Sequence, residues 1–169
     1  MMKHIMGPNS QSDLTNVRPE DIQPNAVDLR IDKVFKINKG LFALSDSDGR
    51  KIHRGSEEIP TFHDTNFWRL EPGTYEIVME NIIEVGPDEA GWVITRSTLN
   101  RNGVFITSGL YDSGYHGVMA GALHITNGPF EIERGTRVGQ FLLFKAESLS
   151  QYDGSYGIGK EHDKKYTAQ

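Results

Sequence analysis

The stretch GWVITRSTLNRNGVFITSGLYDSGYHGVMAGALHIT, residues 91–126, is the basis of our fold prediction. Its three strand-like runs, at 91–95, 103–107 and 117–126, are short and bounded by Gly, Asn or Asp. Such runs between turn residues are typical of β-strands. The same kind of run occurs outside this stretch at residues 26–37, 74–79, 82–85 and 137–146. We therefore predict an all-β sandwich or barrel with few short helices.

The length of 169 residues is ordinary for one domain, so we predict a single domain. We place that domain at residues 1–150, with a short helical turn within 15–22. Residues 38–66 are polar and read as an insertion that contains a β-hairpin around 45–50. Residues 151–169 are rich in Gly and Tyr and then charged, so we expect a mobile C-terminal arm unless a ligand or partner orders it.

Composition excludes several classes of protein. The net charge of −5 disfavours a protein that coats nucleic acid. The absence of cysteine removes disulfides, thiol nucleophiles and thiolate zinc sites, and it is compatible with a reducing compartment. No apolar run approaches the length of about 18 residues needed for a membrane span. We expect a soluble protein of the cytoplasm with no nucleic-acid or membrane partner.

Residues 95–103 combine two arginines with two hydroxyl side chains after a strand-like run. The planar donor forks of Arg96 and Arg101 suit phosphate oxygens. Ser97 and Thr98 can add hydroxyl and backbone N–H donors. The alternative interpretation of this segment alone is a charged surface turn.

Residues 108–117 place one carboxylate among glycines and tyrosines. Asp112 is a candidate general base, and Tyr115 is a candidate to stack on a sugar or base. The alternative is a hairpin in which Asp112 caps its own turn through hydrogen bonds to the backbone.

Together, these segments resemble two motifs of the trimeric dUTPases and the related dCTP deaminases. Residues 96–99, Arg-Ser-Thr-Leu, are similar to the Arg-Ser-x-Leu motif, and residues 109–117 are similar to Gly-Val-Ile-Asp-x-x-Tyr-x-Gly. Residues 25–29 resemble the Ala-x-Asp-Leu motif, and residues 134–140 resemble Gly-x-Arg-Ile-Ala-Gln. The four motifs occur in the family's order, and the resemblance covers about residues 23–159.

The resemblance implies a distorted, jelly-roll-like β-sandwich that assembles as a homotrimer with active sites between subunits. Asp112 would be the base that activates water for attack on the α-phosphate, and Arg96 would orient it. Ser97 and Gln140 would bind phosphate oxygens, and Thr98 and Arg101 are further substrate-binding candidates from their own donor groups.

The remaining roles that the resemblance implies concern the nucleoside and the metal. The hairpin backbone, including Gly109 and Leu110, would bind uracil, with Tyr115 under the deoxyribose. Tyr156 in the C-terminal arm would stack on the base. Asp28 would support Mg²⁺ through water, and a hard cation on the triphosphate is also expected from its charge.

The resemblance leaves two reactions open, and we predict hydrolysis of dUTP to dUMP and diphosphate. The resembling deaminases use a Glu to shuttle protons. Counting forward from Gly117 places the equivalent position at Ala122, and counting back from Asn127 places it at His124. No Asp or Glu lies between Asp112 and Glu131. The alternatives are a dCTP deaminase, or a bifunctional deaminase-diphosphatase, and a non-catalytic trimer that serves as a structural or protein-binding module.

Overall fold

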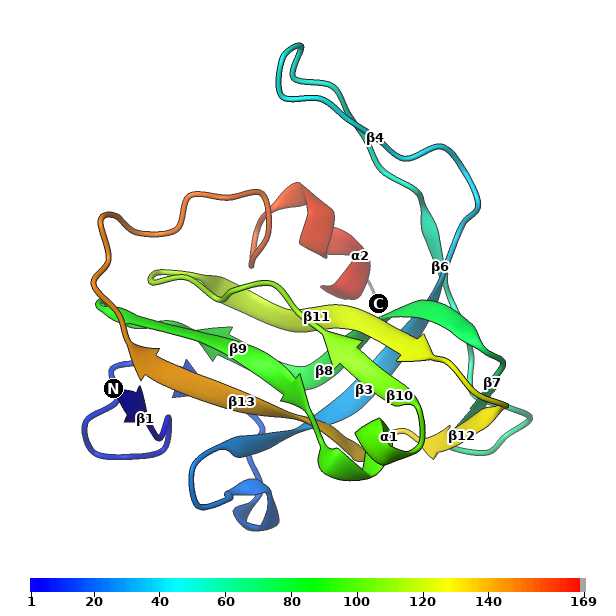
Figure 1. Ribbon diagram of the computed structural model, residues 1–169, viewed down its shortest axis with the longest axis horizontal. Helices are drawn as coiled ribbons and strands as arrows, with labels where there is room; N and C mark the ends of the chain where they lie inside the picture. Colours follow the sequence, from blue (N-terminus) through cyan, green and yellow to red (C-terminus); the bar gives the residue numbers. More distant parts are fainter. Residues whose placement is uncertain (168–169) are drawn as a thin grey trace.

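A curled antiparallel sheet forms the body of the computed structural model, which describes residues 1–167 (Figure 1). Its strands are ordered β1-β13-β3-β8-β11-β10, and β9, β2 and β6 pair with β13, β8 and β3. The bounds of these strands are β1 Met2–Lys3, β2 Asp13–Leu14, β3 Val27–Ile37, β6 Ser56–Glu58, β8 Gly73–Glu84, β9 Glu89–Thr95, β10 Val104–Thr107, β11 His116–Ile125 and β13 Arg137–Lys145. The all-β prediction is confirmed.

Two small sheets and four short helices complete the described chain. The small sheets pair β4 (Ala43–Leu44) with β5 (Lys51–Ile52) and β7 (Phe67–Leu70) with β12 (Phe130–Glu133). The helices are η1 (Pro19–Asp21), α1 (Ser97–Arg101), η2 (Glu161–Asp163) and α2 (Lys164–Thr167). Within residues 1–167, none of the helices combines the length and the apolar character needed to span a membrane.

Alternation of side chains places the core on one face of the strands. Val27, Leu29 and Ile31 of β3 are fully buried, and Phe141 and Leu143 of β13 are each only 1% exposed. The two runs predicted at 74–79 and 82–85 are one continuous strand, β8. Buried Asn81 does not interrupt it, since its Nδ2 donates to the carbonyl of Thr15 at 2.7 Å.

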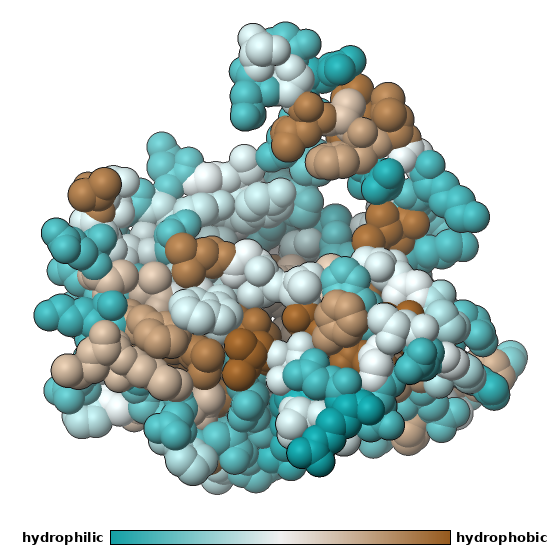
Figure 2. All heavy atoms as spheres, viewed as in Figure 1, coloured by the Kyte–Doolittle hydropathy of each residue, from teal (hydrophilic) through white to brown (hydrophobic). Residues whose placement is uncertain are grey.

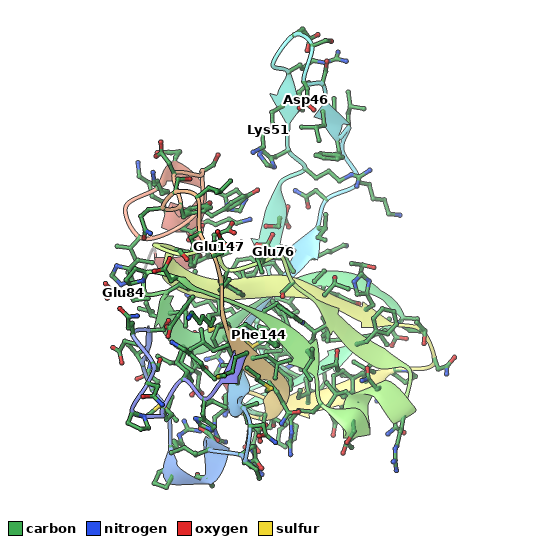
Figure 3. All side chains as sticks on the ribbon, turned by 60° about the vertical axis from the view of Figure 1, so that its left-hand side comes forward. Asp46, Lys51, Glu76, Glu84, Phe144 and Glu147 are labelled. Atoms are coloured by element: carbon green, nitrogen blue, oxygen red, sulfur yellow. The ribbon has the colours of Figure 1, made fainter. Side chains whose placement is uncertain are left out.

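The insertion at residues 38–66 forms an arm that rises from the sheet (Figures 1 and 3). Its β4–β5 hairpin is closed by a hydrogen bond from Ser45 N to Arg50 O at 2.9 Å, so the predicted hairpin is confirmed. Leu41 and Leu44 on this arm are more than half exposed.

The C-terminal tail lies against the body of the same chain, with α2 above β11 in Figure 1. Tyr166 is buried and packs edge-on against Phe35, with the ring centroids 5.9 Å apart. Lys165 Nζ lies 2.8 Å from Glu76 Oε1. The tail thus buries more than its composition suggested, while its mobility stays a prediction. Residues 168 and 169 of the predicted arm lie outside the described residues.

Candidate active site

Asp28 is the centre of a polar cluster on β3 and β13. Asp28 is 1% exposed and lies opposite Gln140 in the β3–β13 register. Gln140 Nε2 donates to Asp28 Oδ1 at 3.0 Å, and Gln23 Nε2 donates to Oδ2 at 3.1 Å. Arg137 Nη1 and Arg96 Nε lie 3.3 Å and 3.5 Å from the same Oδ2. The fold therefore brings together Asp28, Arg96 and Gln140 from three of the four motifs.

The contacts of Asp28 do not match those expected for its predicted water-mediated role at Mg²⁺. Both oxygens of Asp28 already accept from amide or guanidinium donors, which does not fit a carboxylate that holds the water shell of a cation. Within the described residues, no group of three or more His, Cys, Asp or Glu side chains is placed to hold a metal. Asp28 instead holds Arg96 and Gln140 in fixed positions, where their remaining donors can face an anion.

The three other predicted phosphate ligands follow Arg96 directly on α1. Ser97, Thr98 and Arg101 are exposed, whereas Leu99 is buried and anchors the helix to the core. The predicted surface turn is therefore a five-residue helix. Its exposed hydroxyls and guanidinium adjoin the Asp28 cluster in sequence, and their phosphate-binding role stays a prediction.

Residues 108–115 form a hairpin loop between β10 and β11 that presents Asp112 to solvent. Tyr111 is buried and exchanges two backbone hydrogen bonds with Gly91, at 2.7 and 3.0 Å. Tyr115 is also buried, and its hydroxyl donates to Val118 O at 2.9 Å. Burial raises the pKa of the Tyr115 hydroxyl, which keeps it protonated for this bond. Two anchored tyrosines thus flank an exposed Asp112.

The Asp112 carboxylate is not used by the turn itself. The backbone closes the turn, with Tyr115 N donating to Asp112 O at 3.0 Å. Within residues 1–167, the Asp112 carboxylate accepts no hydrogen bond and forms no ion pair. The interpretation of Asp112 as a cap of its own turn is therefore not supported, and the carboxylate is available to an incoming water.

A pocket of about 590 Å³ lies beside this hairpin loop. Four predicted substrate ligands line it: Gly109, Leu110, Tyr115 and Tyr156. Four further lining residues are His, Asp or Glu side chains that the motifs did not indicate: His53, Glu76, His162 and Asp163. In Figure 3 the Glu76 side chain lies between the tail and the base of the arm. Burial lowers the pKa of His162 and raises that of Asp163, which favours the neutral form of each.

The two positions considered for a deaminase Glu, Ala122 and His124, both lie on β11. The pairing of β11 with β8 shifts register between Val118 and Ala120, which lies before both positions. Ala122 lines the pocket and offers no proton-transfer group. His124 stacks on Phe105, and its two ring nitrogens lie 3.2 Å and 2.9 Å from threonine hydroxyls. These contacts account for His124 as a structural residue on the surface of the β10–β11 pair.

Asp112 and Arg96 lie at opposite ends of β9. Tyr111 pairs with Gly91 near the start of this strand, and Arg96 follows its last residue, Thr95. With a rise of about 3.3 Å per residue, the backbone from Gly91 to Thr95 spans roughly 13 Å. Within one chain, the predicted base and the predicted phosphate site therefore lie toward opposite ends of this strand.

The outer face of β9 and β13 is apolar beside the Asp28 cluster. Trp92 stacks on Phe144 with the ring centroids 4.6 Å apart, and both Trp92 and Ile94 are more than one third exposed. Ile94 lies opposite Gln140 and Trp92 opposite Leu142 in the strand register. Figure 2 shows apolar atoms gathered over this part of the body. An exposed aromatic face of this kind is typical of a protein interface.

Comparison with known proteins adds three likenesses. The dCTP deaminase-like family model matches residues 4–146. The chain is 34% identical over 144 residues to the probable deoxyuridine 5'-triphosphate nucleotidohydrolase of Halobacterium salinarum, which covers 83% of this chain and 85% of the relative. The protein of the same name from Methanopyrus kandleri is 32% identical over 156 residues, covering 90% and 99%.

A solved structure shares the fold. The crystal structure of 2'-deoxycytidine 5'-triphosphate deaminase from Agrobacterium tumefaciens matches with a TM-score of 0.57 and 17% identity. The match covers 78% of this chain and 43% of the deaminase chain. This likeness supports the architecture described above.

Proposed function

The chain belongs to the dCTP deaminase-like family, and from this premise we propose that it hydrolyses dUTP to dUMP and diphosphate in the cytoplasm. The names of its relatives from Halobacterium salinarum and Methanopyrus kandleri support this choice within the family. The observation that carries the proposal is the exposed, unpaired carboxylate of Asp112 on a hairpin loop whose neighbours line a nucleoside-sized pocket.

The proposed reaction is an attack of water on the α-phosphorus. Asp112 accepts a proton from the water while the water oxygen forms a bond to the α-phosphorus. The bond from the α-phosphorus to the bridging oxygen breaks, and diphosphate leaves with the electron pair. Arg96 and Gln140, held by Asp28, bind the phosphate oxygens and stabilise the charge that develops on them.

The other predicted residues complete the substrate site. Ser97, Thr98 and Arg101 would donate to phosphate oxygens from exposed positions on α1. Mg²⁺ would arrive as the counterion of dUTP, because the triphosphate supplies the oxygens that a hard cation prefers. No residue of the Asp28 cluster is needed to hold it.

The nucleoside half of dUTP would occupy the pocket beside the hairpin loop. Gly109 and Leu110 are exposed at its edge, so their backbone groups are open to a base. Tyr115 would pack under the deoxyribose, and Tyr156, which is 39% exposed, would cover the base.

We expect Tyr115→Ala to narrow the preference for dUTP over UTP, because a ring packed under the sugar leaves no room for a 2'-hydroxyl. The measurement is the ratio of kcat/KM for the two nucleotides. Tyr115→Phe is the matched control, since it keeps the ring and loses only the bond to Val118 O. Efficient hydrolysis of UTP by the wild-type protein would exclude this role.

The separation of Asp112 from Arg96 supports assembly, and we propose a homotrimer with sites between subunits. The apolar face of β9 and β13 adjoins Gln140, so a second chain on this face would reach the phosphate site. Its Asp112 would then complete the site.

We expect light scattering to give about 57 kDa, three times the chain mass of 19.0 kDa. Trp92→Asp should shift the protein toward 19.0 kDa, because a charge would be buried in the interface. Ile52→Asp, on the equally exposed arm, is the control and should remain a trimer. A monomeric wild-type protein at micromolar concentration would contradict the proposal.

A second candidate function, deamination of dCTP, is favoured by one observation. Glu76 lies directly opposite Ala122 in the β8–β11 register and lines the same pocket. Its pairing with Lys165 argues against it as a free proton shuttle.

One assay separates the candidates. The protein is incubated with Mg²⁺ and each deoxynucleoside triphosphate, and diphosphate and ammonia are measured separately. Diphosphate from dUTP alone supports the proposal, and ammonia from dCTP supports deamination. If neither diphosphate nor ammonia forms, a non-catalytic trimer is the better interpretation.

A further inference from the structure

A second cleft, of about 550 Å³, shares a wall with the Asp28 cluster. Its charged lining consists of five arginines and two glutamates: Arg18, Arg30, Arg96, Arg134, Arg137, Glu80 and Glu133. Because Arg96 and Arg137 also contact Asp28, the cleft continues directly from the proposed phosphate site. The excess of arginine suits an anion.

Four of the five arginines already have acidic partners. Arg96 and Arg137 lie beside Asp28, as described above. Arg18 Nη2 lies 3.0 Å from Glu80 Oε2. Arg30 Nη2 lies 2.6 Å from Asp21 Oδ1, and the same atom lies 3.3 Å from a Glu20 oxygen.

Arg134 differs from the other four. Within residues 1–167, its guanidinium has no carboxylate within ion-pair distance, and its buried Nε has no hydrogen-bond partner. A buried donor without a partner costs free energy, which a bound anion would offset. Glu133 is the adjacent residue in the chain and lines the same cleft, yet it forms no ion pair with Arg134.

The Arg134 side chain is also held in place before any ligand binds. Its guanidinium carbon lies 5.3 Å from the ring centre of Trp68, which is 1% exposed. Trp68 Nε1 donates to Ile59 O at 2.9 Å, and Arg134 N donates to Asn66 O at 2.8 Å. A stacked guanidinium loses little freedom when it binds an anion.

We propose that this cleft binds the terminal phosphates of the nucleoside triphosphate and that Arg134 is the residue that selects for them. The inference rests on the proposed function, since it places the α-phosphate at the Asp28 cluster. Arg96 and Arg134 line the same cleft, so an extended polyphosphate would contact both, whereas a single phosphate would contact one of them. Arg134 therefore favours triphosphate over shorter nucleotides.

The test uses calorimetric titration of the full chain with inorganic tripolyphosphate and, separately, with orthophosphate. We expect tripolyphosphate to bind more tightly, and Arg134→Gln to weaken its binding by at least about tenfold, because a charge-assisted bond is lost. Arg134→Lys should give an intermediate loss, since it keeps the charge and loses the donor fork. Arg50→Gln, on the exposed arm, is the matched control and should bind as the wild type does.

Two results would overturn the inference: unchanged tripolyphosphate binding in Arg134→Gln, or an equal loss in Arg50→Gln, which would indicate non-specific attraction. Thermal denaturation accompanies each variant, and Arg134→Lys decides the matter if Arg134→Gln does not fold. Binding is measured without turnover, so the two proposals can fail separately. Tripolyphosphate binding that depends on Arg134 would stand even if dUTP were not hydrolysed, and dUTP hydrolysis with no effect of Arg134 would refute this inference alone.

Discussion

Replacing Asp112 by Asn is expected to lower dUTP turnover by about 10²–10⁴-fold, the usual contribution of a positioned general base. The amide keeps the shape of the side chain but cannot accept the proton of the attacking water. Affinity for the nucleotide should change little, because Asp112 contacts water and not the phosphate donors. The measurement is kcat for diphosphate release, together with the dissociation constant of a non-hydrolysable dUTP analogue.

The surroundings of Asp112 allow its catalytic role to be tested without an effect on folding. Asp112 is exposed and holds no other part of the chain, so Asp112→Asn should not destabilise the fold. Asp46→Asn, at the tip of the arm, is a control of equal chemistry and similar exposure and should keep full activity. Near-normal turnover in Asp112→Asn would remove Asp112 from the mechanism.

The fold could be predicted from the sequence because strand alternation is a local signal. The runs at 26–37 and 137–146 became β3 and β13 almost without change. The helix α1 could not be predicted in this way, since five residues are too few to show helical periodicity, and Leu99 anchors them to the core. The tail is similar: its position depends on contact between Tyr166 and Phe35, which are more than a hundred residues apart.

The motifs named candidate site residues, but only part of the geometry that groups them could be predicted. The motifs identified Asp28, Arg96, Asp112 and Gln140 as functional candidates. Their grouping depends on strand register, which sets Asp28 opposite Gln140 at a separation of 112 residues and leaves Asp112 at the far end of β9. The placement of Arg134 beside Trp68 and of Glu76 beside Lys165 depends on cross-strand and tail contacts that no local pattern encodes.

Because Asp112 lies apart from the Asp28 cluster, we expect two inactive variants to recover activity when they are mixed. Arg96→Gln should be as inactive as Asp112→Asn, because it removes a phosphate donor from every site. When the two variants are unfolded together and refolded as mixed trimers, some sites combine wild-type Asp112 from one chain with wild-type Arg96 from another. With random assembly about a quarter of the sites are intact, so we expect about a quarter of the wild-type turnover.

The control for this mixture comes from the geometry of the cluster. Arg96 and Gln140 contact the same Asp28, so both act from one chain. A mixture of Arg96→Gln with Gln140→Ala should therefore recover no activity, since every phosphate site still lacks one of its two donors. Recovery in both mixtures, or in neither, would contradict a site divided between Asp112 of one subunit and the Asp28 cluster of the next. Recovery in the first mixture alone would require that division, because no single chain in that mixture carries both wild-type residues.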